Sequence, residues 1–458
     1  MDLDDEQRAA VAKRLHDEEI ETVVCVVPDI WGRLMGKRVT TESFLKTALR
    51  PEGLHASLYL FVVDMDMDPR PGYELSNWRT GFSDFRMVPD LTTFRTASWL
   101  DSTAIVICDA YQEDSDELVE VAPRSILRRQ LDRAAADNLR FKTAAELEFY
   151  LYRTPPAQAW ASRYEDLEPL SYFRADYHIL QSSRDDHFIE SIRRHMNASG
   201  IEVEFSKTEW GLGQQEINLR YAEALEMADR HALYKNGVKE MAQANGWSAT
   251  FMAKPSISDI GSSCHIHASV WDSDDTAKMP DPAAPHELSG LARSFLGGLL
   301  EHTPELMWLF APNVNSYKRF QSASFAPTAV TWGRDNRTCA YRVVGEGESL
   351  RVENRMPGAD VNPYLSAAAT VMAGLDGIKR QLDCGEPFDG DAYSGRDLGS
   401  MPTTLRDGLD LFAGSSLASA ALGDAVHEHL IHFGRQELEA FQHECVTDWE
   451  RIRYFERI

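Results

Sequence analysis

Carboxylate side chains that could hold a cation occur in two separate segments of this sequence. Glu146 and Glu148 lie two residues apart within an apolar run, residues 145–151. Because side chains two apart on a strand share a face, both carboxylates would point the same way. Glu209 and Glu216 flank a pair of glycines, and a tight turn there would let their carboxylates converge. Each pair also fits an exposed strand edge or a surface hairpin, so neither pair is diagnostic by itself.

Histidines and arginines of complementary chemistry follow later in the chain. His265 and His267 would share a strand face after a glycine-containing turn, a spacing that fits metal ligation or a structural role. Arg351, Glu353 and Arg355 alternate with uncharged residues, so all three would face one side of a strand. A second basic set lies between these segments: Lys318, Arg319, Arg334, Arg337 and Arg342.

The inventory of these segments indicates phosphoryl transfer. Oxygen-rich ligation by carboxylates favours Mg²⁺ or Mn²⁺, and an imidazole ligand favours tolerance of Mn²⁺. Carboxylates gathered without a cation would repel one another and raise one another's pKa. Arginines add positive charge where phosphate oxygens would lie. In phosphoryl transfer the protein mainly positions the reacting groups and neutralises their charge, which is what such a set can do.

The overall charge excludes several classes of partner. The 47 basic and 72 acidic residues give 47 − 72 = −25, so we expect neither nucleic acid nor anionic membrane as a partner. We find no apolar run long enough to span a membrane. The acidic start, MDLDDEQRAA, lacks the features of a secretory signal. The six cysteines form no CxxC pair, and reduced, mostly buried thiols fit a cytoplasmic protein.

The order of the expected elements divides the chain into two parts. Short strands dominate the first part, and longer helices alternate with strands afterwards. The pattern therefore predicts an α+β protein with a small β-rich N-terminal domain, residues 1–112, and a large domain, residues 113–458. We expect helices over 1–19, 124–138, 221–245, 288–302, 363–382 and 423–443, strands over 20–27 and 103–109, an apolar run over 58–63, and loops over 67–77, 271–285 and 386–402.

The ordered motifs resemble those of type-I glutamine synthetases over nearly the whole chain. Residues 313–319 match that family's NSYKR block, residues 253–267 its KP and GSGxHxH blocks, and residues 362–365 its NPYL block. The resemblance implies a β-grasp-like N-terminal domain and a catalytic domain with a curved antiparallel sheet and helices. It also implies a dodecamer of two stacked six-membered rings. Each active site would lie between neighbouring subunits.

The resemblance further implies an ATP-dependent ligase with two or more Mg²⁺ or Mn²⁺ ions per site. The γ-carboxylate of L-glutamate would attack ATP, and an amine would then displace phosphate from γ-glutamyl phosphate. The matching positions are Glu148, Glu209 and Glu216 for the first metal; Glu146, His265 and Glu353 for the second; His267, Arg342 and Arg351 for ATP; Gly261, Arg319 and Arg355 for glutamate; and Arg337 and Arg342 for phosphate.

Departures from the family pattern concern the acceptor. The Asp-Gly-Ser-Ser block of ammonia-using members is missing, and the corresponding stretch contains Asp64 and Asp66, either of which could orient an ammonium group. Phe325 replaces the flap glutamate, and Ile260 replaces an asparagine. These changes favour an organic amine, such as ethanolamine, a polyamine, or an alkyl- or arylamine. The alternatives are a true glutamine synthetase with an unusual flap and a non-catalytic member of the family, which the intact metal and arginine sets disfavour.

One regulatory position also departs from the pattern. Adenylylated members carry a tyrosine in an NLYDLP block, and Gly399 stands at that position here. Because glycine has no hydroxyl group, we expect no control by adenylylation.

Overall fold

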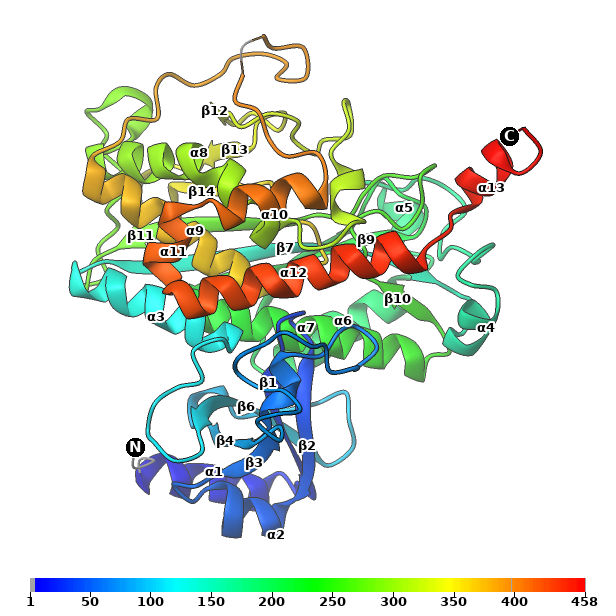
Figure 1. Cartoon of the computed structure of the whole chain (residues 1–458), viewed down its shortest axis with the longest axis vertical. Helices are drawn as coiled ribbons and strands as arrows, with labels where there is room; N and C mark the ends of the chain where they lie inside the picture. Colours follow the sequence, from blue (N-terminus) through cyan, green and yellow to red (C-terminus); the bar gives the residue numbers. More distant parts are fainter. Residues whose placement is uncertain (1–4, 397, 458) are drawn as a thin grey trace.

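A computed structural model describes residues 5–396 and 398–457. The first part of the chain forms a six-stranded sheet of order β2-β1-β6-β4-β3, with β5 paired to β6. β1 and β6 are parallel, and the other pairs are antiparallel. Figure 1 shows this sheet beside α1 (Asp5–Asp17) and α2 (Thr41–Ser43), below the main body. Its strands are β1 (Thr22–Pro28), β2 (Leu34–Thr40), β3 (Leu54–Ser57), β4 (Asp84–Pro89), β5 (Arg95–Thr96) and β6 (Thr103–Gln112).

An eight-stranded sheet forms the centre of the remaining chain. Its order is β12-β13-β14-β11-β7-β9-β8, with β10 paired to β7. All pairs are antiparallel except β12 and β13. The strands are β7 (Arg140–Tyr152), β8 (Val203–Thr208), β9 (Gln214–Glu223), β10 (Ser248–Thr250), β11 (Cys264–Trp271), β12 (Trp332–Arg334), β13 (Tyr341–Val344) and β14 (Arg351–Asn354).

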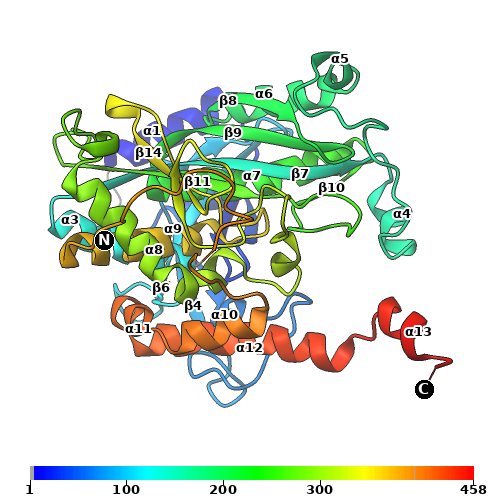
Figure 2. The ribbon, with the colours of Figure 1, turned by 90° about the horizontal axis from the view of Figure 1, so that it is seen from above.

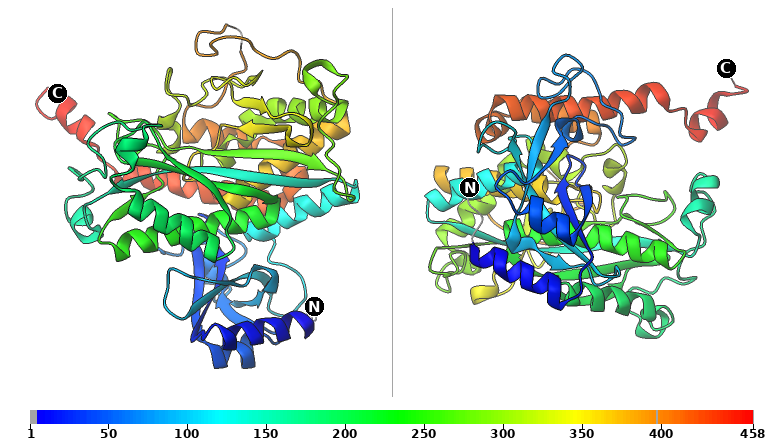
Figure 3. Two further views of the ribbon diagram at one scale, coloured as in Figure 1. Left: turned by 180° about the vertical axis from the view of Figure 1, so that it is seen from behind. Right: turned by 90° about the horizontal axis from the view of Figure 1, so that it is seen from below.

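Helices cover the large sheet and join it to the small one. α7 packs against β7 and β9, while α9 packs against α3 and α8. Figure 2 shows the long strands β7 and β9 to one side of α8 and α9, and the left view of Figure 3 shows α7, in green, below the strands. The helices are α3 (Pro123–Ala136), α4 (Pro156–Ala161), α5 (Ile179–Ser182), α6 (Asp186–Ala198), α7 (Ala224–Ala244), α8 (Gly290–Phe310), α9 (Pro363–Arg380), α10 (Leu405–Ala413), α11 (Ser416–Leu422), α12 (Asp424–Glu444) and α13 (Asp448–Tyr454).

Several expected elements differ from the observed ones. The apolar run 58–63 begins as a 3₁₀ helix, Leu58–Phe61, whose start is capped by the Ser57 hydroxyl. The helix expected to end at residue 302 continues through Pro304 to Phe310, because the apolar residues beyond the proline are buried in the core. α7 begins later than expected because residues 221–223 still belong to β9. The first four residues of the helix expected over 1–19 lie outside the described part.

The segment between β6 and β7, which contains α3, connects the two sheets along the chain. The domain boundary after residue 112 stays a prediction. Within the described residues, no helix combines the length and apolar character needed to cross a membrane.

Candidate active site

Strand register brings the expected site residues of three strands together. β7 lies between β9 and β11 in the large sheet. In that register Glu148 stands directly opposite Glu216, and Glu146 stands directly opposite His265. Because directly opposed side chains on one face approach closely, the pairing by itself creates two neighbouring polar clusters.

The first cluster consists of Glu148, Glu209 and Glu216, whose carboxylate oxygens lie within 4.8 Å of one another. Glu209 follows the end of β8 and is paired with Lys207, whose Nζ also lies 3.8 Å from Glu216 Oε2. Ser263 donates to Glu148 from both its backbone N–H and its hydroxyl. One ammonium group therefore pairs with two of the three carboxylates.

Burial and mutual repulsion act on the protons of this cluster. Burial, together with the neighbouring Glu209, raises the pKa of Glu148 to about 7. Burial and the neighbouring carboxylates raise the pKa of Glu216 still further. Burial also opposes ionisation of Glu209, but its hydrogen bond with Glu216 and the charge of Lys207 lower its pKa overall. Burial and repulsion oppose simultaneous ionisation of the three carboxylates, and a bound divalent cation would relieve that repulsion.

The second cluster consists of Glu146, His265 and Glu353, whose ligand atoms also lie within 4.8 Å of one another. His265 Nδ1 lies 3.1 Å from Glu146 Oε2 and 3.5 Å from Glu353 Oε1. The Glu353 side chain is fully buried and accepts hydrogen bonds from Arg342 and Arg355. Oxygen ligands with one imidazole nitrogen fit Mg²⁺ or Mn²⁺, so both clusters are suitable for divalent cations.

A third group with comparable spacing, formed by Glu301, His302 and Asp376, lies between α8 and α9. Arg380 forms ion pairs with Glu301 at 2.5 Å and with Asp376 at 2.9 Å. Both ring nitrogens of His302 are also hydrogen-bonded already, to Glu305 and Asp376, so we do not count this group among the candidate metal sites.

The two main clusters open into a single cavity of about 340 Å³. Every residue of the two clusters lines this cavity, together with the residues expected to bind the substrate glutamate and phosphate. The basic side chains of this lining are Lys207, Arg319, Arg337, Arg342 and Arg355. The cavity therefore combines a dense set of carboxylates with positive charge from several directions.

An adjoining cavity of about 490 Å³ shares Glu146 with the first. His267 and Arg351, two of the expected ATP-binding residues, line this second cavity rather than the first. Arg351 Nε donates to His267 Nδ1 at 3.1 Å, so the other ring nitrogen carries the proton that bonds Glu146 at 2.8 Å. The aromatic residues that line this second cavity include Phe205, Tyr221 and Trp271.

The residues expected to bind the substrate glutamate form one edge of the main cavity. A Cβ atom on Gly261 would lie 2.5 Å from Arg319 Cγ, so only glycine permits this approach. Burial lowers the pKa of Arg319 to about 10, which still leaves it charged at neutral pH. The buried Nε groups of Arg319 and Arg355 have no hydrogen-bond partner among the described residues. Such donors beside a cavity fit an anionic ligand, since buried polar groups are otherwise nearly always paired.

The residues expected to contact the acceptor amine lie in two separate places. Phe325 lines the main cavity with 64% of its surface exposed, and its carbonyl accepts a hydrogen bond from Arg355. Ile260 lines the same cavity. Asp64 and Asp66 instead line a separate pocket beside α12, with Arg70 and Glu437 among the neighbours. In a single chain, therefore, these aspartates do not join the two carboxylate clusters.

Some residues of the site were not among the functional residues predicted from the sequence. Lys207 bridges two carboxylates, and Ser263 donates twice to Glu148. Asp335 accepts from Arg342 and thereby orients it. Lys207 stands two residues before Glu209, so alternation along the strand could have identified it. Asp335 had no comparable signal, because its contact depends on how β12 and β13 meet.

Comparisons with a family model, with related sequences and with solved structures agree. The family model described as the catalytic domain of glutamine synthetase matches residues 120–454. The chain is 46% identical over 440 residues to gamma-glutamylethanolamide synthetase of Streptomyces coelicolor, covering 96% of this chain and 94% of that protein. It is 35% identical over 447 residues to glutamate–isopropylamine ligase of a Pseudomonas species, covering 97% of each. A solved complex of GmaS with ADP superposes with a TM-score of 0.85 at 29% identity, covering 97% of this chain and 99% of that one.

Proposed function

This chain belongs to the glutamine synthetase family, and we propose that it joins the γ-carboxylate of L-glutamate to an organic primary amine at the expense of ATP. The observation that carries the proposal is the convergence of both carboxylate clusters and five basic side chains on one cavity. The names of the two relatives describe glutamate–amine ligation with ethanolamine or isopropylamine as the amine. The proposed product is therefore a γ-glutamylamide.

The residues of the main cavity have distinct proposed roles. Glu148, Glu209 and Glu216 would hold one Mg²⁺ or Mn²⁺, and Glu146, His265 and Glu353 another. Bound divalent cations would neutralise phosphate oxygens of ATP. Of the basic residues, Arg319 and Arg355 would bind glutamate, while Arg337 and Arg342 would stabilise charge on the transferring phosphoryl group. His267 and Arg351 face the adjoining cavity and would position ATP there.

The reaction proceeds in two steps that use these groups in turn. The glutamate γ-carboxylate oxygen forms a bond to the γ-phosphorus of ATP while the bond to ADP breaks. The neutral amine nitrogen then attacks the γ-carbonyl carbon of γ-glutamyl phosphate. Phosphate leaves, and the amine loses a proton to a base or to solvent. Ordered positioning of the reacting atoms supplies much of the rate enhancement in such transfers.

The acceptor wall favours an amine that carries carbon. A phenyl ring at residue 325 cannot accept a proton from ammonium, but it can cover a hydrocarbon chain or face a cation. Burying roughly 60–100 Å² of apolar surface would favour an organic amine by about 1.5–2.5 kcal/mol, or about ten- to seventyfold. Ammonia as the main acceptor is the alternative function. A non-catalytic role is disfavoured because the cavity retains its complete set of charged residues.

We also propose that the active site is completed in a dodecamer of two stacked rings. The separation of Asp64 and Asp66 from their own chain's carboxylate clusters supports an arrangement in which they serve a neighbouring subunit. The C-terminal helix α13 projects from the body in Figure 1, and Trp449 on this helix and Phe455 directly after it are exposed. Apolar side chains on a projecting helix fit contact between subunits.

A phosphate-release assay with ATP and glutamate tests the function. We expect turnover with Mg²⁺ or Mn²⁺, its loss after chelation, and a higher kcat/KM for at least one organic amine than for ammonia. The panel contains ethanolamine, a polyamine, isopropylamine, an aniline and ammonia. If ammonia is the best acceptor, the enzyme is a glutamine synthetase. Full activity after exhaustive metal removal would disprove the metal assignments.

A further inference from the structure

The turn between β1 and β2, residues 29–33, is held by an internal ion pair. The Asp29 side chain is completely buried and follows directly after the apolar strand β1. Arg33 donates to it twice, from Nε to Oδ2 at 2.7 Å and from its backbone N–H to Oδ1 at 2.8 Å. A buried carboxylate is costly unless it is paired, so Arg33 is confined to one orientation.

The free edge of the Arg33 guanidinium extends to the loop that contains Asp64 and Asp66. Its Nη1 donates to the Met65 carbonyl at 2.8 Å, and its Nη2 donates to the Asp64 carbonyl at 3.3 Å. The Asp64 carboxylate is used inside the loop, where Oδ1 accepts from the backbone N–H groups of Asp66 and Asp68. Arg70 pairs with its other oxygen, Oδ2. The loop is thus internally braced, and Arg33 holds its backbone from outside.

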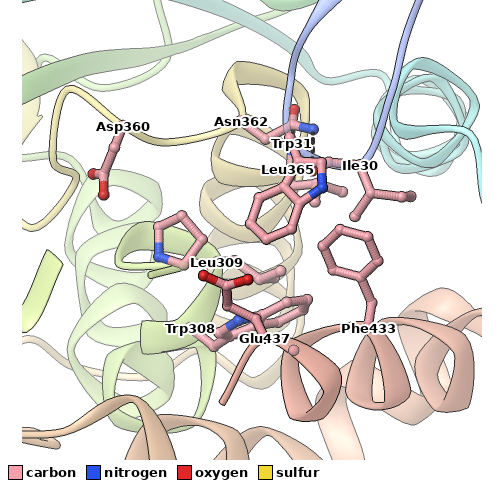
Figure 4. Close-up of a pocket in the computed structure, with 11 residues that line it drawn as sticks. Ile30, Trp31, Trp308, Leu309, Asp360, Asn362, Leu365, Phe433 and Glu437 are labelled. Atoms are coloured by element: carbon pink, nitrogen blue, oxygen red, sulfur yellow. Dashed lines mark hydrogen bonds between the residues drawn. The ribbon is translucent and has the colours of Figure 1, made fainter. Parts of the chain in front are cut away.

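The same turn is fastened to the catalytic part of the chain. Asn362 Nδ2 donates to the carbonyls of Asp29 and Ile30, at 3.1 and 2.9 Å, while its Oδ1 caps the start of α9. A Cβ atom on Gly32 would lie 3.2 Å from Asn362 Cα, which shows how closely the turn approaches α9. Figure 4 shows Asn362 beside Ile30 and Trp31, with Phe433 of α12 next to them.

A ring contact adds a second attachment. The Trp31 ring lies 4.7 Å from the Phe433 ring, centroid to centroid, at an angle of 57°. The turn therefore touches α9 and α12 on one side and the loop of residues 64–68 on the other. Asn362, which makes the contact at the start of α9, follows β14 closely along the chain. β14 carries Glu353 of the second carboxylate cluster.

We infer that Arg33 is a positioning residue for acceptor-amine binding, because it fixes the 64–68 loop relative to the catalytic part of its own subunit through Asp29 and Asn362. The inference rests on the proposed function, in which this loop serves the acceptor side of a neighbouring site. Arg33 itself touches no substrate. Its loss would release the loop while leaving the ATP, glutamate and metal residues in place.

Steady-state kinetics of Arg33→Met and Arg33→Lys test this role. For Arg33→Met we expect KM for the best organic amine to rise about tenfold, since misplaced binding groups weaken productive positioning. KM for ATP, KM for glutamate and kcat at saturating amine should change less than about twofold on the same reasoning. Lysine keeps the charge beside Asp29 but lacks the fork that spans two carbonyls, so Arg33→Lys should give an intermediate rise.

The matched control is Arg86→Met. Arg86, on β4 of the small sheet, also hydrogen-bonds backbone carbonyls, but its partners are the carbonyls of Gln112, Pro51 and Ser115 and the Asp116 carboxylate. This variant should leave KM for the amine unchanged. If both methionine variants alter all substrates alike, or if Arg33→Met leaves the amine KM unchanged, the positioning role is wrong. Should Arg33→Met not fold, Arg33→Lys decides the question by the same readout. Failure of the proposed function is separate, because it would appear in the unmodified enzyme as a preference for ammonia.

Discussion

Arg342 Nη1 lies 2.7 Å from Oε2 of Glu353, a carboxylate with no exposed surface. The second carboxylate oxygen is bonded by Arg355. Two arginines thus keep Glu353 ionised, and although burial opposes ionisation, the charge of Arg355 brings its pKa to about 2. The same carboxylate belongs to the cluster with Glu146 and His265. Glu353 therefore stands where the metal-binding and the phosphate-facing groups of the proposed site meet.

Removing the Glu353 carboxylate should impair catalysis severely. In Glu353→Ala the second cluster loses one ligand, and two arginines lose their buried partner. We expect turnover to fall by a factor of about a hundred or more, the size typical for loss of one electrostatic contact in an active site. Phosphate release measures the loss, and titration with Mn²⁺ monitored by electron paramagnetic resonance should show weaker metal binding.

A neutral, nearly isosteric variant and a surface control complete that experiment. Glu353→Gln preserves the shape but removes the charge, and should also reduce Mn²⁺ affinity. Glu202→Gln removes an exposed ion pair with Arg220 and should behave like the unmodified enzyme, because such pairs contribute little. Native turnover in Glu353→Ala would mean that this carboxylate only neutralises the arginines.

Replacing Phe325 with a carboxylate should change the choice of acceptor. Phe325→Glu removes apolar surface from the cavity wall and adds a negative charge that can hold ammonium. We expect the ratio of kcat/KM for ammonia to that for the best organic amine to rise about tenfold. Phe325→Gln separates the loss of the ring from the gain of charge, and should raise the ratio less. An unchanged ratio in both variants would place the amine elsewhere.

Gly399, which the resemblance places at the adenylylated position, has no hydroxyl group, and its surroundings are tightly packed. Its carbonyl accepts a 2.8 Å hydrogen bond from Val330 N–H, and an added Cβ would lie 2.8 Å from the Val330 carbonyl oxygen. Neighbouring Asp397 lies outside the described residues. Intact mass analysis of protein from its native host should show no added adenylyl group. Peptide mapping that found one within residues 393–402 would contradict the expectation.

His429 should make stability depend on pH. Burial lowers its pKa to about 4, and its Nε2 donates to the Phe61 carbonyl at 2.9 Å. In the unfolded chain its pKa would be near 6.5, so between these values the unfolded state binds a proton that the folded state does not. Folding stability should therefore decline as pH falls through this window, by up to about 3 kcal/mol from this group.

Thermal unfolding of His429→Gln checks that prediction. Glutamine can still donate to the Phe61 carbonyl but does not titrate, so the melting midpoint should depend less steeply on pH between about 6.5 and 4. His16→Gln is the control, since His16 is exposed on α1. Equal pH dependence in the unmodified enzyme and in His429→Gln would show that other groups account for the acid sensitivity.

Much of this site is readable from residue types and local periodicity. Alternation within single strands places Glu146 with Glu148, and His265 with His267, on common faces. The order of the motifs carries the resemblance to glutamine synthetases, which the family match over residues 120–454 confirms. These features are local or linear, so they depend little on how distant segments pack. The main helices were likewise predictable, because their apolar periodicity and caps lie within the segment itself.

The tertiary structure decided which of these groups meet. Only the register of β7 with β9 and β11 sets Glu148 opposite Glu216 and Glu146 opposite His265, and a shift of one residue would turn those side chains to the other face. The separation of Asp64 from both clusters, and its support by Arg33, likewise depend on long-range packing. Periodicity along a chain specifies a face, but the partner across that face is chosen by non-local contacts. The sequence by itself therefore determined the chemistry available to this protein, and the packing of distant strands determined where that chemistry is assembled.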